Sequence, residues 1–175
     1  MSLERLTAAI RDIPDFPRPG ILFKDITPIL RDAGLFREAV ALFVERHRDH
    51  RIEQVAGIES RGFIFGAAVA HELGAGFVPV RKAGKLPADT VQVSYDLEYG
   101  SATLELHTDA VTPGQRVLVL DDLLATGGTA AATLSLLRQL RAEVVEIDFL
   151  VELRFLHGRD RLPDVPVYAP IVFDP

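Results

Sequence analysis

A run of apolar residues, a pair of acids and a glycine-containing loop lead directly into a helix in the middle of this sequence. Val117 to Leu120 are four consecutive apolar residues, which predicts a strand buried on both faces, as in a parallel sheet covered by helices. Strong helix formers predict a helix over 130–140. Asp121 and Asp122 follow the apolar run at the expected end of the strand. A strand, a short loop and a helix in this order predict an α/β fold.

The loop between this strand and helix is suited to a phosphate group. Glycines allow the backbone to approach a ligand closely, and N–H groups at the start of a helix attract an anion. Two acids beside such a loop would repel a bare anion, but they suit a ligand that also carries hydroxyls or Mg²⁺. A phosphorylated sugar meets both needs. The alternative is an ordinary junction in which Asp and Thr act as caps. The predicted phosphate-binding residues are Ala125, Thr126, Gly127, Gly128 and Thr129.

Two better-known phosphate motifs are absent from this loop. No Gly-Lys-[Ser/Thr] follows a glycine at the Walker A spacing, and the dinucleotide pattern G-x-G-x-x-G is missing. The loop therefore indicates neither a P-loop nucleotide site nor a dinucleotide site.

Composition narrows the classes of protein that are possible. The 175 residues suit one domain, 1–175, and the contents of 48% hydrophobic and 25% charged residues are typical of a globular chain. No apolar run is long enough to cross a bilayer, and the first residues lack the features of a signal peptide. The chain has no cysteine, which agrees with a cytoplasmic location. A net charge of −6 argues against nucleic acid as a partner, so a polyphosphate site must gather its cations locally.

Cations follow two predicted strands. Ser60 and Arg61 come after the strand predicted over 54–58, and Arg81, Lys82 and Lys85 come after the strand predicted over 76–80. Ligands bind at the carboxyl ends of the strands in open α/β sheets, so these cations are placed to meet an anion. Solvated surface turns are the alternative interpretation.

The remaining periodicity completes a sheet of about five strands. Alternating residues over 91–97 and 102–107 predict an antiparallel hairpin. Helices are predicted over 3–13, 32–50 and 63–73, and further strands over 144–151 and 165–168. The histidines show no metal-ligand spacing, and His47 and His50 are expected to be solvated at a helix end, which argues against a structural zinc.

The segment 117–129 resembles the phosphoribosyl pyrophosphate signature of the type I phosphoribosyltransferases. Three other segments, 16–26, 59–63 and 97–100, narrow the resemblance to members of that family that act on adenine. The resemblance implies a mainly parallel sheet flanked by helices, an antiparallel flap hairpin, an N-terminal hood segment and a homodimer. It also implies Mg²⁺, held through the diphosphate of the substrate with no direct protein ligand.

The resemblance further assigns roles to residues that periodicity alone leaves open. Phe23 would stack on the purine, while the backbone of Leu22 and Lys24 reads the edge of the ring; Lys24 stands where arginine is common in relatives. The diphosphate would contact Ser60, Arg61, Arg81 and Lys85. In the flap, Glu98 would accept a proton from the purine and Tyr99 would lie beside it, and Asp121 and Asp122 would bind the ribose hydroxyls in the catalytic centre.

The implied activity is that of a glycosyltransferase of the pentosyltransferase class. It would transfer a 5-phosphoribosyl group from phosphoribosyl pyrophosphate to adenine, giving AMP and pyrophosphate in purine salvage. Two alternatives remain open: a transferase for another base, such as hypoxanthine/guanine, xanthine or orotate, and a non-catalytic sensor of phosphoribosyl pyrophosphate. Neither nucleic acid nor a membrane is expected as a partner.

Overall fold

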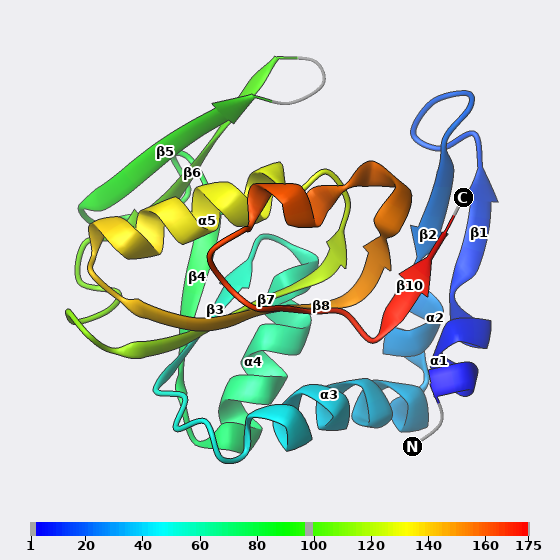
Figure 1. Ribbon diagram of the computed structural model, residues 1–175, viewed down its shortest axis with the longest axis horizontal. Helices are drawn as coiled ribbons and strands as arrows, with labels where there is room; N and C mark the ends of the chain where they lie inside the picture. The colour runs from blue at the N-terminus through cyan, green and yellow to red at the C-terminus, as the bar shows by residue number, and fades with distance from the viewer. Residues whose placement is uncertain (1–2, 97–99, 175) are drawn as a thin grey trace.

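The fold is centred on an eight-stranded sheet in a computed structural model that describes residues 3–96 and 100–174 (Figure 1). The strand order is β10-β8-β7-β3-β4-β6-β5, and β9 pairs with β8 beside this path. Pairing is parallel from β10 to β4, and β6 and β5 are antiparallel. The strands are β3 (Gln54–Ile58), β4 (Gly76–Lys82), β5 (Thr90–Asp96), β6 (Ser101–His107), β7 (Arg116–Leu124), β8 (Glu143–Leu153), β9 (Val167–Tyr168) and β10 (Ile171–Phe173). The predicted α/β fold with a mainly parallel sheet is confirmed.

Helices cover both faces of this sheet. Helix α5 (Gly128–Gln139) lies on one face, and α3 (Ala33–His47) and α4 (Arg61–Leu73) lie on the other (Figure 1). Along β7, Val117 and Val119 pack into the core beneath α5, whereas Leu118 and Leu120 pack into the core on the α3 and α4 side. All four side chains are fully buried, which confirms a strand covered on both faces.

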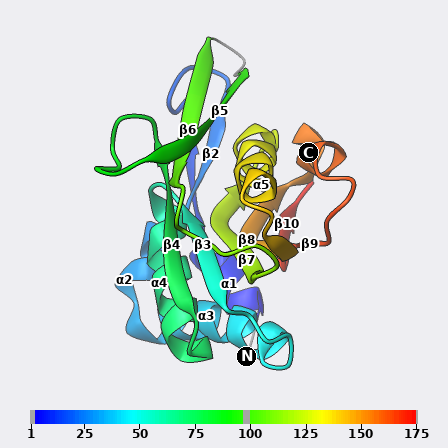
Figure 2. The same cartoon turned by 90° about the vertical axis from the view of Figure 1, so that its left-hand side faces the viewer.

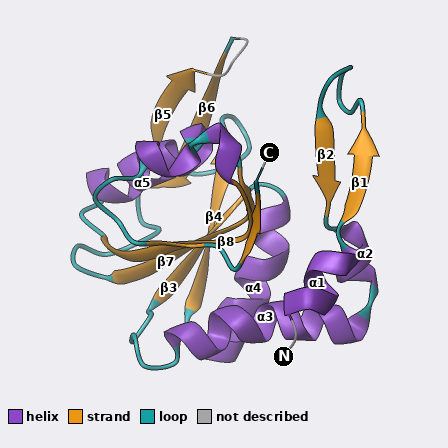
Figure 3. Ribbon diagram, turned by 45° about the vertical axis from the view of Figure 1, so that its right-hand side comes forward, coloured by secondary structure: helices purple, strands orange, loops and turns teal. Residues whose placement is uncertain are grey.

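The N-terminal segment forms a small hairpin instead of the long helix predicted over 3–13. Helix α1 (Leu3–Ala9) is short, and β1 (Arg11–Pro14) pairs antiparallel with β2 (Leu22–Asp25). Figure 3 shows this hairpin standing apart from the main sheet, above α1 and α2 (Thr27–Arg31). Ion pairs join its strands, with Arg11 to Asp25 at 2.6 Å and Lys24 to Asp12 at 2.6 Å. These ion pairs favour the hairpin over a helix that continues to residue 13, because such a helix would separate the paired residues.

The second hairpin is the one predicted from alternation. Strands β5 and β6 pair in register from Thr90↔His107 to Asp96↔Ser101. In Figures 1 and 2 this hairpin projects beyond α5, on the same side of the molecule as the β1–β2 hairpin. The two flap residues assigned by resemblance, Glu98 and Tyr99, lie outside the described residues.

Strand β7 is longer than predicted. The sequence places Asp121 and Asp122 after the end of the strand, but the strand continues to Leu124. Pairing with β3 stops at Leu120, while pairing with β8 continues to Leu124. The two acids therefore lie where β7 loses its neighbour on one side, so the prediction was wrong about the end of the strand.

The C-terminal segment returns along the sheet. Two 3₁₀ turns, η1 (Arg154–Leu156) and η2 (Gly158–Arg161), follow β8, and the strand predicted over 165–168 appears as the two-residue β9. No strand was predicted over Ile171–Phe173, where β10 pairs in parallel with β8. Among the helices of the described residues, none has the length and apolarity required to cross a membrane.

Candidate active site

A cavity of about 270 Å³ opens where β3 and β7 end. Its walls come from the turn after β3, the last residues of β7, the loop that follows β7 and the start of α5. The lining residues are Glu59, Ser60, Arg61, Asp121, Asp122, Leu123, Leu124, Ala125, Thr126, Gly127, Gly128, Thr129, Ala130 and Phe149. The cavity therefore brings together nine of the predicted site residues: the two acids, all five residues of the phosphate loop, Ser60 and Arg61.

Arg61 and the two acids form one charged group on the cavity wall. Asp122 is only 4% exposed, and its Oδ2 accepts a hydrogen bond from Nε of Arg61. Gly62 allows this approach, because a Cβ there would lie 2.7 Å from the carbonyl oxygen of Leu120. The backbone N–H of Asp122 donates to Oδ1 of Asp121 at 2.9 Å.

The pKa values of Asp121 and Arg61 are both raised, for different physical reasons. Burial, and then the adjacent charge of Asp122, raise the pKa of Asp121 well above its usual value. Burial acts to lower the pKa of Arg61, but the charge and hydrogen bond of Asp122 raise it overall. Arg61 therefore stays charged, while Asp121 keeps its proton to a higher pH than an ordinary aspartate.

The phosphate loop takes its shape from a close backbone contact. Gly127 has φ +79° immediately before α5, a conformation that favours glycine. A Cβ on Gly127 would lie 2.3 Å from the carbonyl oxygen of Gly158, and a Cβ on Gly158 would lie 2.3 Å from that of Ala125. Gly158, in η2, is thus a site residue that sequence reasoning missed. The only available signal was a glycine in the C-terminal segment.

Two predicted diphosphate cations lie beside the cavity but do not line it. Nε of Arg81 lies 3.2 Å from the Glu59 carboxylate, and Nζ of Lys85 lies 3.7 Å from it. Glu59 itself lines the cavity, so this carboxylate joins both cations to the site. Its role was not predicted, because an acid beside a diphosphate site has no obvious function in the sequence alone.

The predicted base-binding segment adjoins the cavity through Arg61. The Arg61 guanidinium lies 5.9 Å from the centre of the Phe23 ring, and the Phe16 ring packs edge-on against Phe23 at 5.1 Å. Leu22 is 47% exposed. The side chain of Lys24 turns to Asp12 and to the ring of Phe173, 4.0 Å away, which leaves only the backbone of Lys24 for the predicted contact.

The flap hairpin contacts the phosphate loop directly. The hydroxyl of Tyr95, on β5, lies 3.0 Å from Oγ1 of Thr129. The described part of this hairpin therefore touches the predicted site.

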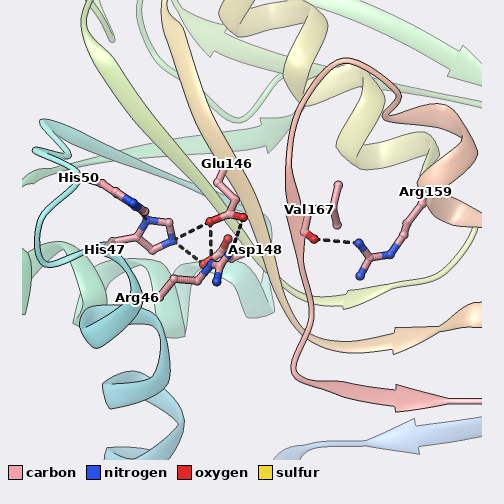
Figure 4. A network of polar contacts seen from close by, with 7 residues as sticks. All are labelled: Arg46, His47, His50, Glu146, Asp148, Arg159 and Val167. Atoms are coloured by element: carbon pink, nitrogen blue, oxygen red, sulfur yellow. Dashed lines mark hydrogen bonds and ion pairs between the residues drawn. The ribbon is translucent and has the colours of Figure 1, made fainter.

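One group of side chains in the described residues has the composition of a metal site, and it lies elsewhere. His47, Glu146 and Asp148 bring their ligand atoms within 4.8 Å of one another (Figure 4). Glu146 and Asp148 on β8 contact His47 at the end of α3, whereas Phe149, the next residue on β8, lines the cavity. Both oxygens of Glu146 already accept hydrogen bonds from Arg46, at 2.7 and 2.6 Å. The group is therefore best described as a buried ion-pair network.

This network corrects the expectation that His47 is solvated and that no histidine joins a ligand-like group. His47 is 1% exposed, and its Nε2 lies 2.7 Å from Oδ2 of Asp148. Burial raises the pKa of Asp148 to about 6, although the hydrogen bond with His47 acts to lower it.

Fold and cavity together define a class: an α/β domain with a ligand-sized cavity at the carboxyl ends of two parallel strands. A family model described as "Phosphoribosyl transferase domain" matches residues 27–165. The class is therefore that of the phosphoribosyltransferases.

Individual relatives show to which group of phosphoribosyltransferases this chain is similar. The adenine phosphoribosyltransferase of Acidobacterium capsulatum is 55% identical over 169 residues, which cover 97% of this chain and 93% of the relative. The crystal structure of the enzyme from Thermoanaerobacter pseudethanolicus matches with a TM-score of 0.95 at 49% identity, covering 98% of this chain and all of that one. The Saccharomyces cerevisiae enzyme, solved with an imino-altritol bisphosphate and adenine, matches with a TM-score of 0.90 at 44% identity over 95% of this chain and 97% of that one. This chain belongs to the adenine phosphoribosyltransferase family.

Proposed function

We propose that this protein transfers the 5-phosphoribosyl group of phosphoribosyl pyrophosphate to adenine, giving AMP and pyrophosphate in purine salvage. The observation that carries the proposal is the single cavity in which Asp121, Asp122 and the loop 125–129 meet. The family supports adenine as the base, since the yeast relative was solved with adenine bound.

In this proposal the phosphate and the ribose hydroxyls of the substrate contact different walls of the cavity. The 5′-phosphate binds the N–H groups of the loop 125–129 at the start of α5, where the helix dipole favours an anion. The ribose hydroxyls face Asp121 and Asp122. Because Asp122 is paired with Arg61 and Asp121 holds its proton to higher pH, the two acids repel a polyphosphate less than two free carboxylates would.

The diphosphate is assigned to the turn after β3 and to the loop after β4. Ser60 and Arg61 line the cavity there, and Arg81 and Lys85 lie next to it through Glu59. When bound, Mg²⁺ neutralises part of the charge of the departing diphosphate. No protein carboxylate has to coordinate it, which agrees with the engagement of Asp122 by Arg61.

The base is assigned to the N-terminal hood. Phe23 stacks on the purine while the backbone of Leu22 and Lys24 contacts its edge, a placement supported by the 5.9 Å between Arg61 and the Phe23 ring. Glu98 accepts the proton that the purine loses, and Tyr99 completes the flap over the site. No covalent intermediate is needed, because catalysis consists of orienting the base and stabilising the leaving diphosphate.

The proposal also covers the setting of the reaction. The protein is a single domain over 1–175 that acts in the cytoplasm as a homodimer, without nucleic-acid or membrane partners. The cysteine-free, acidic composition supports this setting.

The test is pyrophosphate release from phosphoribosyl pyrophosphate and Mg²⁺ in the presence of each base separately. Adenine should support release at a rate far above that with hypoxanthine, guanine, xanthine or orotate. Faster release with another base would mean that this base, and not adenine, is the substrate. Tight binding of phosphoribosyl pyrophosphate with no release for any base would favour the sensor alternative.

A further inference from the structure

Glu59 contacts Arg81 and Lys85, two of the three cations of the predicted diphosphate site. Its Oε2 accepts hydrogen bonds from Nε of Arg81 at 3.2 Å and from the backbone N–H of Lys82 at 3.1 Å. Its Oε1 lies 3.7 Å from Nζ of Lys85. The three side chains together carry a net charge of +1, so the group still attracts an anion.

The Glu59 carboxylate is itself fixed and ionised. Its backbone N–H donates to the carbonyl oxygen of Val80 at 2.9 Å, which anchors the residue between β3 and β4. Burial acts to raise the pKa of Glu59, but the hydrogen bonds from Lys82 and Arg81 and the nearby cations lower it overall. The side chain is 13% exposed, on the wall of the cavity.

In the basic loop, residues 81–87, Glu59 binds the backbone only at the N–H of Lys82. A different buried carboxylate, Glu105 on β6, accepts hydrogen bonds from the N–H groups of Lys85 and Leu86, both at 2.7 Å. Glu105 therefore fixes the main chain of the loop. The distinct contribution of Glu59 is to fix the side chains of Arg81 and Lys85.

We propose that Glu59 is a positioning residue for the diphosphate, which holds Arg81 and Lys85 together at the edge of the cavity before the substrate arrives. The inference rests on the proposed function. Long cationic side chains lose rotamer freedom when they bind a ligand, and ordering them in advance reduces that cost. When the substrate binds, its diphosphate oxygens replace the Glu59 carboxylate as the partners of Arg81 and Lys85.

The test compares Glu59→Ala and Glu59→Gln with the wild-type protein by calorimetric titration. Two ligands are used in the presence of Mg²⁺: phosphoribosyl pyrophosphate, and ribose 5-phosphate, which lacks the diphosphate. Glu59→Ala should weaken binding of phosphoribosyl pyrophosphate about tenfold and leave that of ribose 5-phosphate unchanged. Glu59→Gln keeps an oxygen that can accept from Arg81 and Lys82, so it should recover part of the loss.

Glu53→Gln is the matched control, because Glu53 precedes β3 as Glu59 follows it. Glu53 is exposed and accepts from the backbone N–H of Arg116 at 2.9 Å, and its substitution should change neither binding constant. Equal weakening of both ligands by Glu59→Ala would mean a merely structural role and overturn the proposal. Tighter binding of phosphoribosyl pyrophosphate by both Glu59 variants would also overturn it, because Glu59 would then only repel the substrate.

These titrations need no turnover. A wild-type protein that binds phosphoribosyl pyrophosphate without transferring it to adenine would contradict the proposed function, while the selective loss in Glu59→Ala would still support the role of Glu59.

Discussion

Gly127→Ala tests whether the phosphate loop depends on its contact with Gly158. Two costs add in this variant. Gly127 has φ +79°, and an L-residue in that region loses about 1–2 kcal/mol. The new Cβ would also lie 2.3 Å from the carbonyl oxygen of Gly158, so the backbone has to shift, and forced packing of this kind costs about 1–3 kcal/mol. The free energy of unfolding should therefore fall by about 2–5 kcal/mol.

Gly114→Ala isolates the first cost. Gly114 has φ +82° in the turn before β7, but a Cβ there would meet no atom within 4 Å. This control should lose only about 1–2 kcal/mol. Urea denaturation measures both variants, and the difference of about 1–3 kcal/mol is the contribution of the contact with Gly158.

Substrate binding provides the second measurement for this pair of variants. Because the loop has to move away from Gly158, Gly127→Ala should raise the KM for phosphoribosyl pyrophosphate by about tenfold or more, which corresponds to about 1.4 kcal/mol. Gly114→Ala should leave that KM unchanged. Equal losses of stability in the two variants, with an unchanged KM in Gly127→Ala, would refute the role assigned to Gly158.

Three further substitutions test the site and its surroundings. Asp122→Asn should lower turnover on the order of 100-fold. The free energy of unfolding should fall by only about 1 kcal/mol, since an amide oxygen can still accept a hydrogen bond from Arg61. Initial rates and urea denaturation measure the two effects, and wild-type turnover would contradict the assignment of Asp122 to the ribose hydroxyls. Glu98→Gln should lower kcat about 100-fold in steady-state assays, whereas an effect confined to KM would mean binding alone. Asp148→Asn should remove a pH dependence of stability. A raised pKa means that ionised Asp148 destabilises the fold, so stability is lost as the pH rises from the usual value of 3.8 through about 6, by at most about 3 kcal/mol. Urea denaturation at about pH 4.5 and pH 7.5 should show the variant gaining on the wild type at the higher pH, and an equal difference at both would refute the argument.

Local periodicity was sufficient to predict most of the main sheet. The strand 54–58 has the predicted bounds because its apolar residues are bordered by polar residues on both sides. The helix predicted from residue 32 begins at Ala33, and the side chain of Asp32 caps it by accepting from the N–H groups of Gly34 and Leu35. The resemblance then placed nine site residues around one cavity, because the strand-end geometry of α/β sheets determines where such loops meet.

The errors share a cause, which is that the deciding partner lies far away in the chain. Residues 11–14 leave the predicted helix because they pair with 22–25. His47 is buried because Asp148, 101 positions later, supplies its hydrogen bond. Gly158 matters because its backbone lies against Gly127. No local window contains both His47 and Asp148 or both Gly127 and Gly158, and periodicity within 3–13 does not include the partner strand 22–25, so local reasoning assigns each residue its average environment.

The described hairpin connects the two ends of the proposed substrate site. Tyr95 on β5 reaches Thr129 in the phosphate loop at 3.0 Å, and Glu105 on β6 binds the N–H groups of Lys85 and Leu86 in the basic loop. Because β5 and β6 are paired throughout their length, these contacts belong to one hydrogen-bonded hairpin. A shift of either loop on binding a phosphate group would therefore act on the hairpin formed by β5 and β6. The antiparallel hairpin that interrupts the parallel sheet thus has a physical consequence, since it joins the two loops assigned to the phosphates.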